Sequence, residues 1–388
     1  MANITGDDKL GDTLFGDPYG YAESDTISGL GGDDIIYGGG GVDFLDGGEG
    51  NDFLDAGSGS NQGLYGGNGN DTMLGDGIEF MQGGRGDDLY YVNNVYDTVV
   101  EELDEGVDVV RASISYSLAS GGYVEKLVLE GNAAINGTGN SLDNELYGNA
   151  ADNNLSGGDG NDVLRGGDGN DVLHGDNGDD HLNGESGGNQ LFGGSGNDVY
   201  YIQNATTAVF EAASGGNDGV RSTVSYALTA NVEHLAMDGF SAINGTGNGL
   251  NNSIHGNVAN NSISGGGGND YLAGLGGNDI LTGGSGQDGF LITAPHQGID
   301  TIKDFSVVDD NICIDRSGFG AGLAGGFITA DQFRIGSGAK DGSDRFIYNQ
   351  GTGAVYFDAD GIGGVSEIQI AKVSTGLAMT NQDFFVAG

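Results

Sequence analysis

The chain has a single cysteine, Cys313, so no disulfide can form within it and no thiolate cluster can hold a metal ion. No stretch approaches the roughly 18 apolar residues of a membrane-spanning helix. The N-terminus, MANITGDDKL, lacks the basic segment and the apolar run of a cleavable signal peptide. We therefore expect no membrane span, and any export must use a route without a cleaved signal.

Positive charge is also scarce. Lys and Arg total 12 against 57 Asp and Glu, which gives a formal net charge of −45. This balance argues against nucleic acid and anionic lipid as partners, because both need basic residues to neutralise phosphates. A chain of this charge repels itself unless cations bind it, so metal ions are the simplest expected partner.

The sequence is rich in glycine, with 81 residues, and much of it lies in a nine-residue phrase, as in GGDGNDVLRGGDGNDVLHGDNGDDHLN from Gly157. The phrase runs without a slip from Gly139 to Tyr201 and again from Gly247 to Leu291, with an apolar or aromatic residue at its eighth position. An earlier series starts at Gly29, breaks near Gln62 and resumes at Gly66 and Gly83. One side chain in nine is thus expected to point inward.

Each phrase combines a short strand with a glycine-rich turn, because glycine accepts the positive φ values of tight reversals. We expect each phrase to be half a coil, so that eighteen residues complete one turn and alternate phrases stack at about 4.7–4.9 Å. The sixth-position Asp side chains and turn carbonyls then meet between coils. A flexible ring of hard oxygen ligands suits Ca²⁺ better than Mg²⁺. Merely solvated turns would not explain the fixed phase.

This phrase resembles the RTX, or haemolysin-type, calcium-binding repeat GGxGxDxUx, a parallel β-roll motif. Strict copies occur at Gly38–Asp46, Gly47–Asp55, Gly83–Tyr91, Gly157–Arg165, Gly166–His174, Gly193–Tyr201, Gly265–Ala273 and Gly283–Leu291. The resemblance implies that sixth-position Asp side chains bind Ca²⁺, which here means Asp34, Asp43, Asp52, Asp71, Asp88, Asp162, Asp171, Asp180, Asp198, Asp270, Asp279 and Asp288. An amide stands in the same slot, which argues against full-strength sites, at Asn61, Asn144, Asn153, Asn189, Asn252 and Asn261.

Two matching inserts separate the repeat series, VRASISYSL from Val110 and VRSTVSYAL from Val220. The alternation of Ser113, Ser115 and Ser117 with apolar residues predicts a half-buried strand. We predict an all-β, right-handed parallel β-roll with strand-rich inserts and a C-terminal β cap. Its segments are an irregular first roll (1–92), an insert (93–138), a central roll (139–202), a second insert (203–246), a third roll (247–291) and the cap (292–388).

No catalytic or organic-cofactor site is predicted. The histidines form no His-Glu-x-x-His motif. Ser186, in Gly-Glu-Ser-Gly-Gly, matches the nucleophile elbow of α/β-hydrolases, but it lies inside a phrase in perfect register. The C-terminal NQDFFVAG resembles the uncleaved signal of proteins exported through one-step type I channels. We expect this segment to follow the cap and to serve as the secretion signal that the exporter recognises.

We expect a secreted, extracellular, non-enzymatic calcium-binding protein that folds on Ca²⁺ and serves in adhesion, surface or matrix contact, or host interaction. A polysaccharide or a cell-surface molecule is the expected partner class, with the type I exporter as partner during secretion. The alternative is a carbohydrate-active enzyme, a polysaccharide lyase or alginate epimerase, built on a parallel β scaffold. That alternative needs a groove with a clustered base, acid and cation.

Overall fold

The computed structural model describes residues 3–16, 23–118, 122–320 and 322–388. The remaining positions fall within the predicted first roll, first insert and cap, and lie outside the described residues. The chain divides into two compact units. Unit 1 comprises Met1–Asp198 and Thr206–Val209, and unit 2 comprises Val199–Ala205 and Phe210–Gly388.

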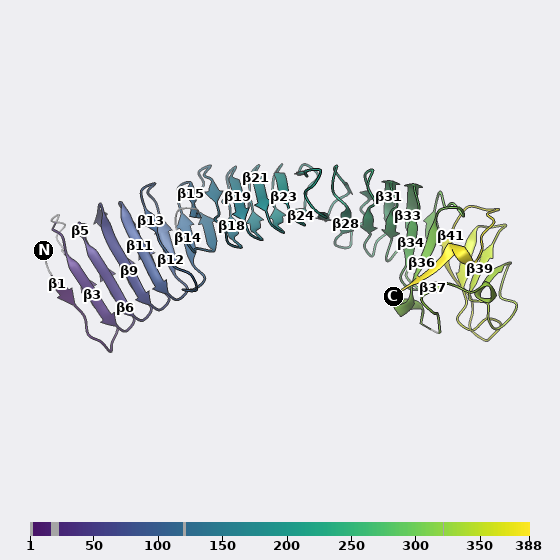
Figure 1. The fold of residues 1–388 in the computed structure, drawn as a ribbon, viewed down its shortest axis with the longest axis horizontal. Helices are drawn as coiled ribbons and strands as arrows, with labels where there is room; N and C mark the ends of the chain where they lie inside the picture. The colour runs from purple at the N-terminus through teal and green to yellow at the C-terminus, as the bar shows by residue number, and fades with distance from the viewer. Residues whose placement is uncertain (1–2, 17–22, 119–121, 321) are drawn as a thin grey trace. The chain divides into compact units, whose positions relative to one another are not determined.

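Unit 1 is a stack of coils whose short strands form parallel ladders (Figure 1). One ladder consists of β2 (Thr13–Phe15), β4 (Ile35–Tyr37), β7 (Phe53–Asp55), β10 (Thr72–Leu74), β12 (Leu89–Val92), β14 (Val109–Ala112), β16 (Lys126–Leu129), β18 (Glu145–Tyr147), β20 (Val163–Arg165) and β22 (His181–Asn183). A second consists of β1 (Asn3–Thr5), β3 (Thr26–Gly31), β6 (Phe44–Glu49), β9 (Gln62–Asn68), β11 (Glu79–Arg85) and β13 (Thr98–Val99). A third consists of β15 (Tyr116–Ser117), β17 (Gly137–Thr138), β19 (Asn154–Asp159), β21 (Val172–Asn177) and β23 (Gln190–Ser195), and β5 (Gly40–Gly41) pairs with β8 (Ser58–Gly59).

The strand register confirms the eighteen-residue coil. Leu146 pairs with Leu164 and Leu164 with Leu182, all at the eighth position of their phrases. On the opposite side Leu155 pairs with Leu173. These leucines are 0 % exposed, so the core of unit 1 is a narrow double row of apolar side chains.

The first insert continues the coils of unit 1 and adds length to them. Its strands β14 and β16 pair with β12 and with each other in the same parallel ladder. The predicted strand over residues 113–118 is too long, because the chain bends at Ser113 and Ile114 and only β15 remains. That bend carries the chain from one ladder to the other.

Unit 2 repeats this construction. One ladder consists of β24 (Val199–Ile202), β26 (Gly219–Ser222), β28 (His234–Met237), β30 (Ser253–His255), β32 (Tyr271–Ala273), β34 (Gly289–Ile292), β36 (Asn311–Asp315) and β42 (Phe384–Ala387), with β37 (Gly326–Phe327) antiparallel to β42. The other consists of β27 (Tyr226–Ala227), β29 (Gly245–Thr246), β31 (Ser262–Gly267), β33 (Ile280–Ser285), β35 (Asp300–Ile302), β41 (Ile368–Lys372), β40 (Ala354–Phe357), β39 (Phe346–Asn349) and β38 (Phe333–Ile335). The remaining elements of unit 2 are the helix α1 (Arg316–Phe319) and the 3₁₀ turns η2 (Ala330–Gln332) and η3 (Asn381–Asp383). The strand β25 (Ala208–Phe210) belongs to the same sheet as β23, and its first two residues are part of unit 1.

The C-terminal residues do not merely follow the cap, as the sequence interpretation had it. They form β42, which pairs in parallel with β36, with Ile312 opposite Phe384. Phe384 is 0 % exposed and its ring lies 5.1 Å from that of Phe346. Phe384 and Val386 of NQDFFVAG are therefore part of the folded core of unit 2, whereas Phe385 is 37 % exposed.

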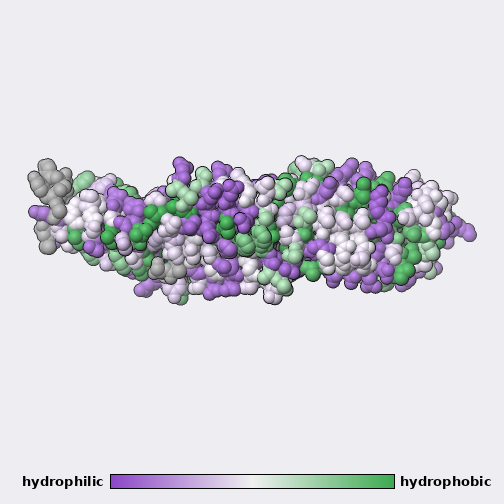
Figure 2. Space-filling view, turned by 90° about the horizontal axis from the view of Figure 1, so that it is seen from above, coloured by the Kyte–Doolittle hydropathy of each residue, from purple (hydrophilic) through white to green (hydrophobic). Residues whose placement is uncertain are grey.

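The predicted fold class is confirmed: the chain is almost entirely β, in parallel β-solenoid coils closed by a β cap. The one α-helix has 4 residues, and within the described residues no helix is long and apolar enough to span a membrane. Figure 2 shows hydrophilic residues interspersed with small hydrophobic patches on the face in view. The apolar surface is thus divided into small areas there.

Candidate metal sites

Buried acidic side chains form columns along the edges of the coils. The Asp162 backbone N–H donates to Asp180 Oδ1 at 2.8 Å, and the Asp180 N–H donates to Asp198 Oδ1 at 2.9 Å. On the other edge the Asn153 N–H donates to Asp171 Oδ1 at 2.9 Å, and the Asp171 N–H to Asn189 Oδ1 at 2.8 Å. Each sixth-position side chain therefore contacts the backbone of the coil before it, and the two edges contain the residues expected from the sequence.

All the Asp residues predicted as ligands occupy this position and are at most 2 % exposed: Asp34, Asp43, Asp52, Asp71, Asp88, Asp162, Asp171, Asp180, Asp198, Asp270, Asp279 and Asp288. In many of them the second oxygen, Oδ2, is buried without a hydrogen-bond partner, namely in Asp34, Asp43, Asp52, Asp71, Asp88, Asp162, Asp171, Asp180, Asp270 and Asp279. A buried carboxylate oxygen without a partner is costly. Their role as metal ligands stays a prediction.

The first glycine of each phrase leaves room beside this oxygen. A Cβ atom on Gly157 would overlap Asp162 Oδ2 and lie 2.8 Å from the carbonyl oxygen of Gly175 one coil on. Gly175 stands in the same relation to Asp180, and a Cβ there would lie 2.6 Å from the Gly193 carbonyl oxygen. A carboxylate oxygen and a carbonyl oxygen therefore converge on each of these glycine Cα atoms. This donor set fits a hard divalent cation of the Ca²⁺ type.

Burial raises the pKa of these carboxyl groups. The pKa of Asp162 rises to about 7 and that of Asp171 to about 6, in both cases mainly through loss of hydration. The pKa of Asp180 rises to about 8, because burial is reinforced by the nearby charges of Asp198 and Asp162. Each column therefore needs protons or cations to be stable.

In the amide residues of these columns the Nδ2 atom makes hydrogen bonds, whereas the corresponding Oδ2 atom of many column Asp residues makes none. Asn153 Nδ2 donates to the Ile135 carbonyl at 2.6 Å, and Asn261 Nδ2 donates to the Ile243 carbonyl at 2.6 Å. Asn144 Nδ2 contacts the carbonyls of Val124 and Glu125. An amide N–H₂ thus contacts carbonyl oxygens of the preceding insert coil, and full-strength cation sites stay unexpected there.

The register predicted for Asn61 is wrong. Asn61 is exposed at φ 62°, and the neighbouring Gln62, 1 % exposed, occupies the column. Sequence reasoning also missed further members of the columns, several of them at irregular spacing. Buried or partly buried side chains at Asp25, Glu79, Asp97, Asp108, Glu125, Asp300 and Asp310 continue the columns. Coils of 17 to 22 residues at several of these contacts hide them from a search with a fixed period.

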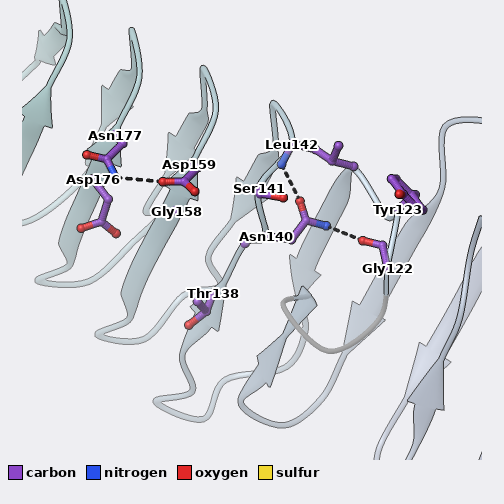
Figure 3. A pocket seen from close by; sticks show the side chains of 11 residues that line it. Gly122, Tyr123, Thr138, Asn140, Ser141, Leu142, Gly158, Asp159, Asp176 and Asn177 are labelled. Atoms are coloured by element: carbon purple, nitrogen blue, oxygen red, sulfur yellow. Dashed lines mark hydrogen bonds between the residues drawn. The ribbon is translucent and has the colours of Figure 1, made fainter. Parts of the chain in front are cut away.

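An open groove of about 730 Å³ lies on the outer surface of unit 1. Figure 3 shows Asp159 and Asp176 on neighbouring coils, with Asn140 and Tyr123 further along. Asn177 Nδ2 donates to Asp159 Oδ1 at 2.8 Å, and Asn140 Nδ2 to the Gly122 carbonyl at 3.1 Å. Among the described residues that line this groove none is a Lys, Arg or His.

Ser186 lies in an exposed turn between β22 and β23. Its N–H donates to the Gly167 carbonyl at 3.0 Å, as expected of a repeat turn. The nucleophile elbow requires a strand before the serine and a helix after it. Here a second strand follows.

Comparisons with known proteins agree with the geometry. A family model described as the RTX calcium-binding nonapeptide repeat matches residues 19–54, 29–62, 138–173, 165–200, 246–281 and 255–290. No curated protein matches. Among solved structures, the extracellular lipase LipA from Serratia marcescens is similar at 18 % identity and a TM-score of 0.19, over 73 % of this chain; the chain spans 45 % of that structure's length. The chain thus contains RTX calcium-binding nonapeptide repeats in three separate regions.

Proposed function

We propose that this chain is an extracellular, non-enzymatic protein that folds when Ca²⁺ fills the carboxylate columns. The observation that carries the proposal is the set of buried Asp Oδ2 atoms without hydrogen-bond partners, each beside a glycine and most of them also beside a carbonyl oxygen of the next coil. A bound Ca²⁺ would supply positive charge and would be coordinated by these oxygens. The twelve predicted Asp residues are its proposed ligands.

Calcium-dependent folding follows from the narrow core. With one inward side chain in nine residues the apolar contribution is small, while the carboxylates within a column repel one another. Binding energy at the columns then becomes folding energy. Extracellular calcium modules bind at roughly 10⁻⁴ to 10⁻³ M, so such sites stay empty in the cytosol and fill outside the cell.

The proposal places the protein on or near an extracellular surface, in adhesion or matrix contact. Exposed aromatic rows on unit 1 support this role: the rings of Phe44 and Tyr65 lie 4.8 Å apart, and those of Tyr65 and Phe80 lie 5.8 Å apart. Phe44 is 43 % exposed and Phe80 is 37 % exposed. Flat exposed rings of this kind offer apolar contact area to a polysaccharide or a cell-surface molecule.

The decisive experiment is a titration of the purified, metal-free chain with Ca²⁺, followed by circular dichroism and calorimetry, with Mg²⁺ as the matched control. We expect β structure to form cooperatively with Ca²⁺ and not with equal Mg²⁺. A fully folded spectrum in excess chelator at neutral pH would refute calcium-dependent folding.

Two further arms test the remaining parts of the proposal. Expression of the whole chain with and without a type I exporter should place it in the medium only when the exporter is present. Incubation of the calcium-loaded chain with a panel of polysaccharides should give binding without new reducing or unsaturated ends. Appearance of such ends would replace the non-enzymatic proposal with the carbohydrate-active one.

A further inference from the structure

Three buried carboxylates meet where the first repeat series passes into the first insert. Asp88 belongs to the nine-residue phrase, whereas Glu101 and Asp108 lie in the insert. One carboxylate oxygen from each lies within 4.8 Å of the others. The residues are 1 %, 2 % and 1 % exposed, respectively.

Backbone N–H groups fix all three side chains. The Asp71 N–H donates to Asp88 Oδ1 at 2.7 Å. The Gly83 N–H donates to Glu101 Oε1 at 3.1 Å, and the Asp88 N–H donates to Asp108 Oδ1 at 2.8 Å. Two further oxygens, Glu101 Oε2 and Asp88 Oδ2, are buried and have no hydrogen-bond partner. The cluster therefore has donor atoms that the protein itself does not use.

The Tyr90 hydroxyl adds a neutral oxygen to this cluster. A Cβ atom on Gly83 would overlap both Asp88 Oδ2 and the Tyr90 hydroxyl, so both oxygens lie against the same Cα atom. Tyr90 is 0 % exposed and its hydroxyl has no hydrogen-bond partner. Carboxylate and hydroxyl oxygens thus surround Gly83, whose own N–H holds Glu101.

We propose that Asp88, Glu101 and Asp108 hold one Ca²⁺-class divalent cation, with the Tyr90 hydroxyl beside it. Three carboxylates gathered in a buried place repel one another and need a cation or shared protons. Unlike the sites proposed between repeats, this one takes two of its three carboxylates from the insert. It would lock the first long coil onto the end of the first repeat series.

The sequence repeats the pattern once more. Asp198, Glu211 and Asp218 follow one another at the same spacing as Asp88, Glu101 and Asp108, although most residues between Glu211 and Asp218 differ from their counterparts. Retention of all three acids within a diverged duplicate favours a shared chemical role.

The end of the third repeat series provides a contrast. There the Gly283 and Gly284 N–H groups donate to the two oxygens of Asp304, and the Asp288 N–H donates to Asp310 Oδ1. Asp304 is exposed, and both its oxygens are used by the backbone. The buried, unpaired oxygen that distinguishes Glu101 has no counterpart in Asp304.

The test is crystallography of the whole chain grown with Ca²⁺ exchanged for Tb³⁺, whose anomalous scattering locates each ion. Wild type is compared with Glu101→Gln and with Glu102→Gln, which removes the same charge from an exposed neighbour. We expect an ion peak among Asp88, Glu101 and Asp108 in wild type and Glu102→Gln, and loss of this peak alone in Glu101→Gln.

Ion peaks in the repeat columns without one at this cluster in wild type would overturn the inference and leave the proposed function intact. A cluster peak that persists unchanged in Glu101→Gln would overturn the role of Glu101. Absence of ions from the repeat columns as well would instead refute the proposed function. The wild-type crystal decides the matter even if Glu101→Gln fails to fold.

Discussion

The two edges of the central repeats in unit 1 share one backbone design but differ in charge. On one edge Asp162, Asp180 and Asp198 follow one another, whereas on the other Asp171 lies between Asn153 and Asn189. The pKa of Asp180 rises to about 8 and that of Asp171 to about 6, although both are 0 % exposed. The charges of Asp198 and Asp162 add to the effect of burial at Asp180, whereas Asp171 has amide neighbours along its edge. The all-acid edge therefore depends more strongly on a cation.

Removal of calcium should have the largest effect on stability, because it should unfold both edges together. In excess chelator at pH 8 we expect both to lose amide protection in hydrogen exchange, since the coils share a single narrow core. Selective loss of protection at Asp162 and Asp180, with Asp171 still protected, would show instead that the edges fold independently.

A methyl group beside the acidic column should have the next largest effect. Gly175→Ala places a Cβ against Asp180 Oδ2 and the Gly193 carbonyl, and such overpacking costs about 1–3 kcal/mol. The calcium midpoint for folding should rise accordingly in titrations followed by circular dichroism. Gly249→Ala is the control, because a Cβ there meets nothing within 4 Å. Equal midpoints for the two variants would argue against a cation site beside Gly175.

Asp180→Asn and Asp171→Asn compare the edges directly, because both remove one charge and nearly preserve side-chain volume. Asp180 lies between two carboxylates, so its replacement should weaken two proposed sites and raise the calcium midpoint by about tenfold, or about 1.4 kcal/mol. Asp171 has amide neighbours, and we expect a smaller shift. Equal shifts in calorimetry, or a larger one for Asp171→Asn, would contradict the comparison.

Most of these edges could be predicted from the sequence, because an unbroken nine-residue period fixes both the inward leucines and the stacking of Asp162 on Asp180. The period fails where coil length changes. Glu101 and Asp108 lie in a coil whose column contact spans 20 residues, so spacing does not align them with Asp88. The core role of Phe384 was missed for another reason: its partner Phe346 lies far away in the sequence.

Lowering the pH should reduce the difference in charge between the two edges, because their carboxyl groups become protonated. In the unfolded chain an Asp has a pKa of about 3.9, and in the metal-free fold the pKa of Asp171 is about 6 and that of Asp180 about 8. The folded state therefore binds more protons, and this stabilisation is full below pH about 4 and lost as the pH rises through about 6 to 8. Metal-free chain should thus be more stable at pH 5 than at pH 8. Circular dichroism in chelator at the two pH values measures the folded fraction, and a larger folded fraction at pH 8 would contradict the raised pKa values.

The smallest effect is expected from making the mixed edge acidic. Asn189→Asp places a carboxylate next to Asp171 and removes the hydrogen bond from Asn189 Nδ2 to the Ser186 carbonyl, which is 3.2 Å long. With saturating calcium the new carboxylate should add ligand charge and offset the lost bond, so thermal stability should change little. At limiting calcium and pH 8, where the chain is only partly folded, the same substitution should destabilise the folded state, because two neighbouring buried carboxylates repel where no cation lies between them. The size of the effect thus depends on calcium, which a merely structural asparagine would not produce. Thermal unfolding of wild type and Asn189→Asp, each at saturating and at limiting calcium, measures the four values needed, and an equal loss of stability in both conditions would show that charge at this edge is not coupled to the metal.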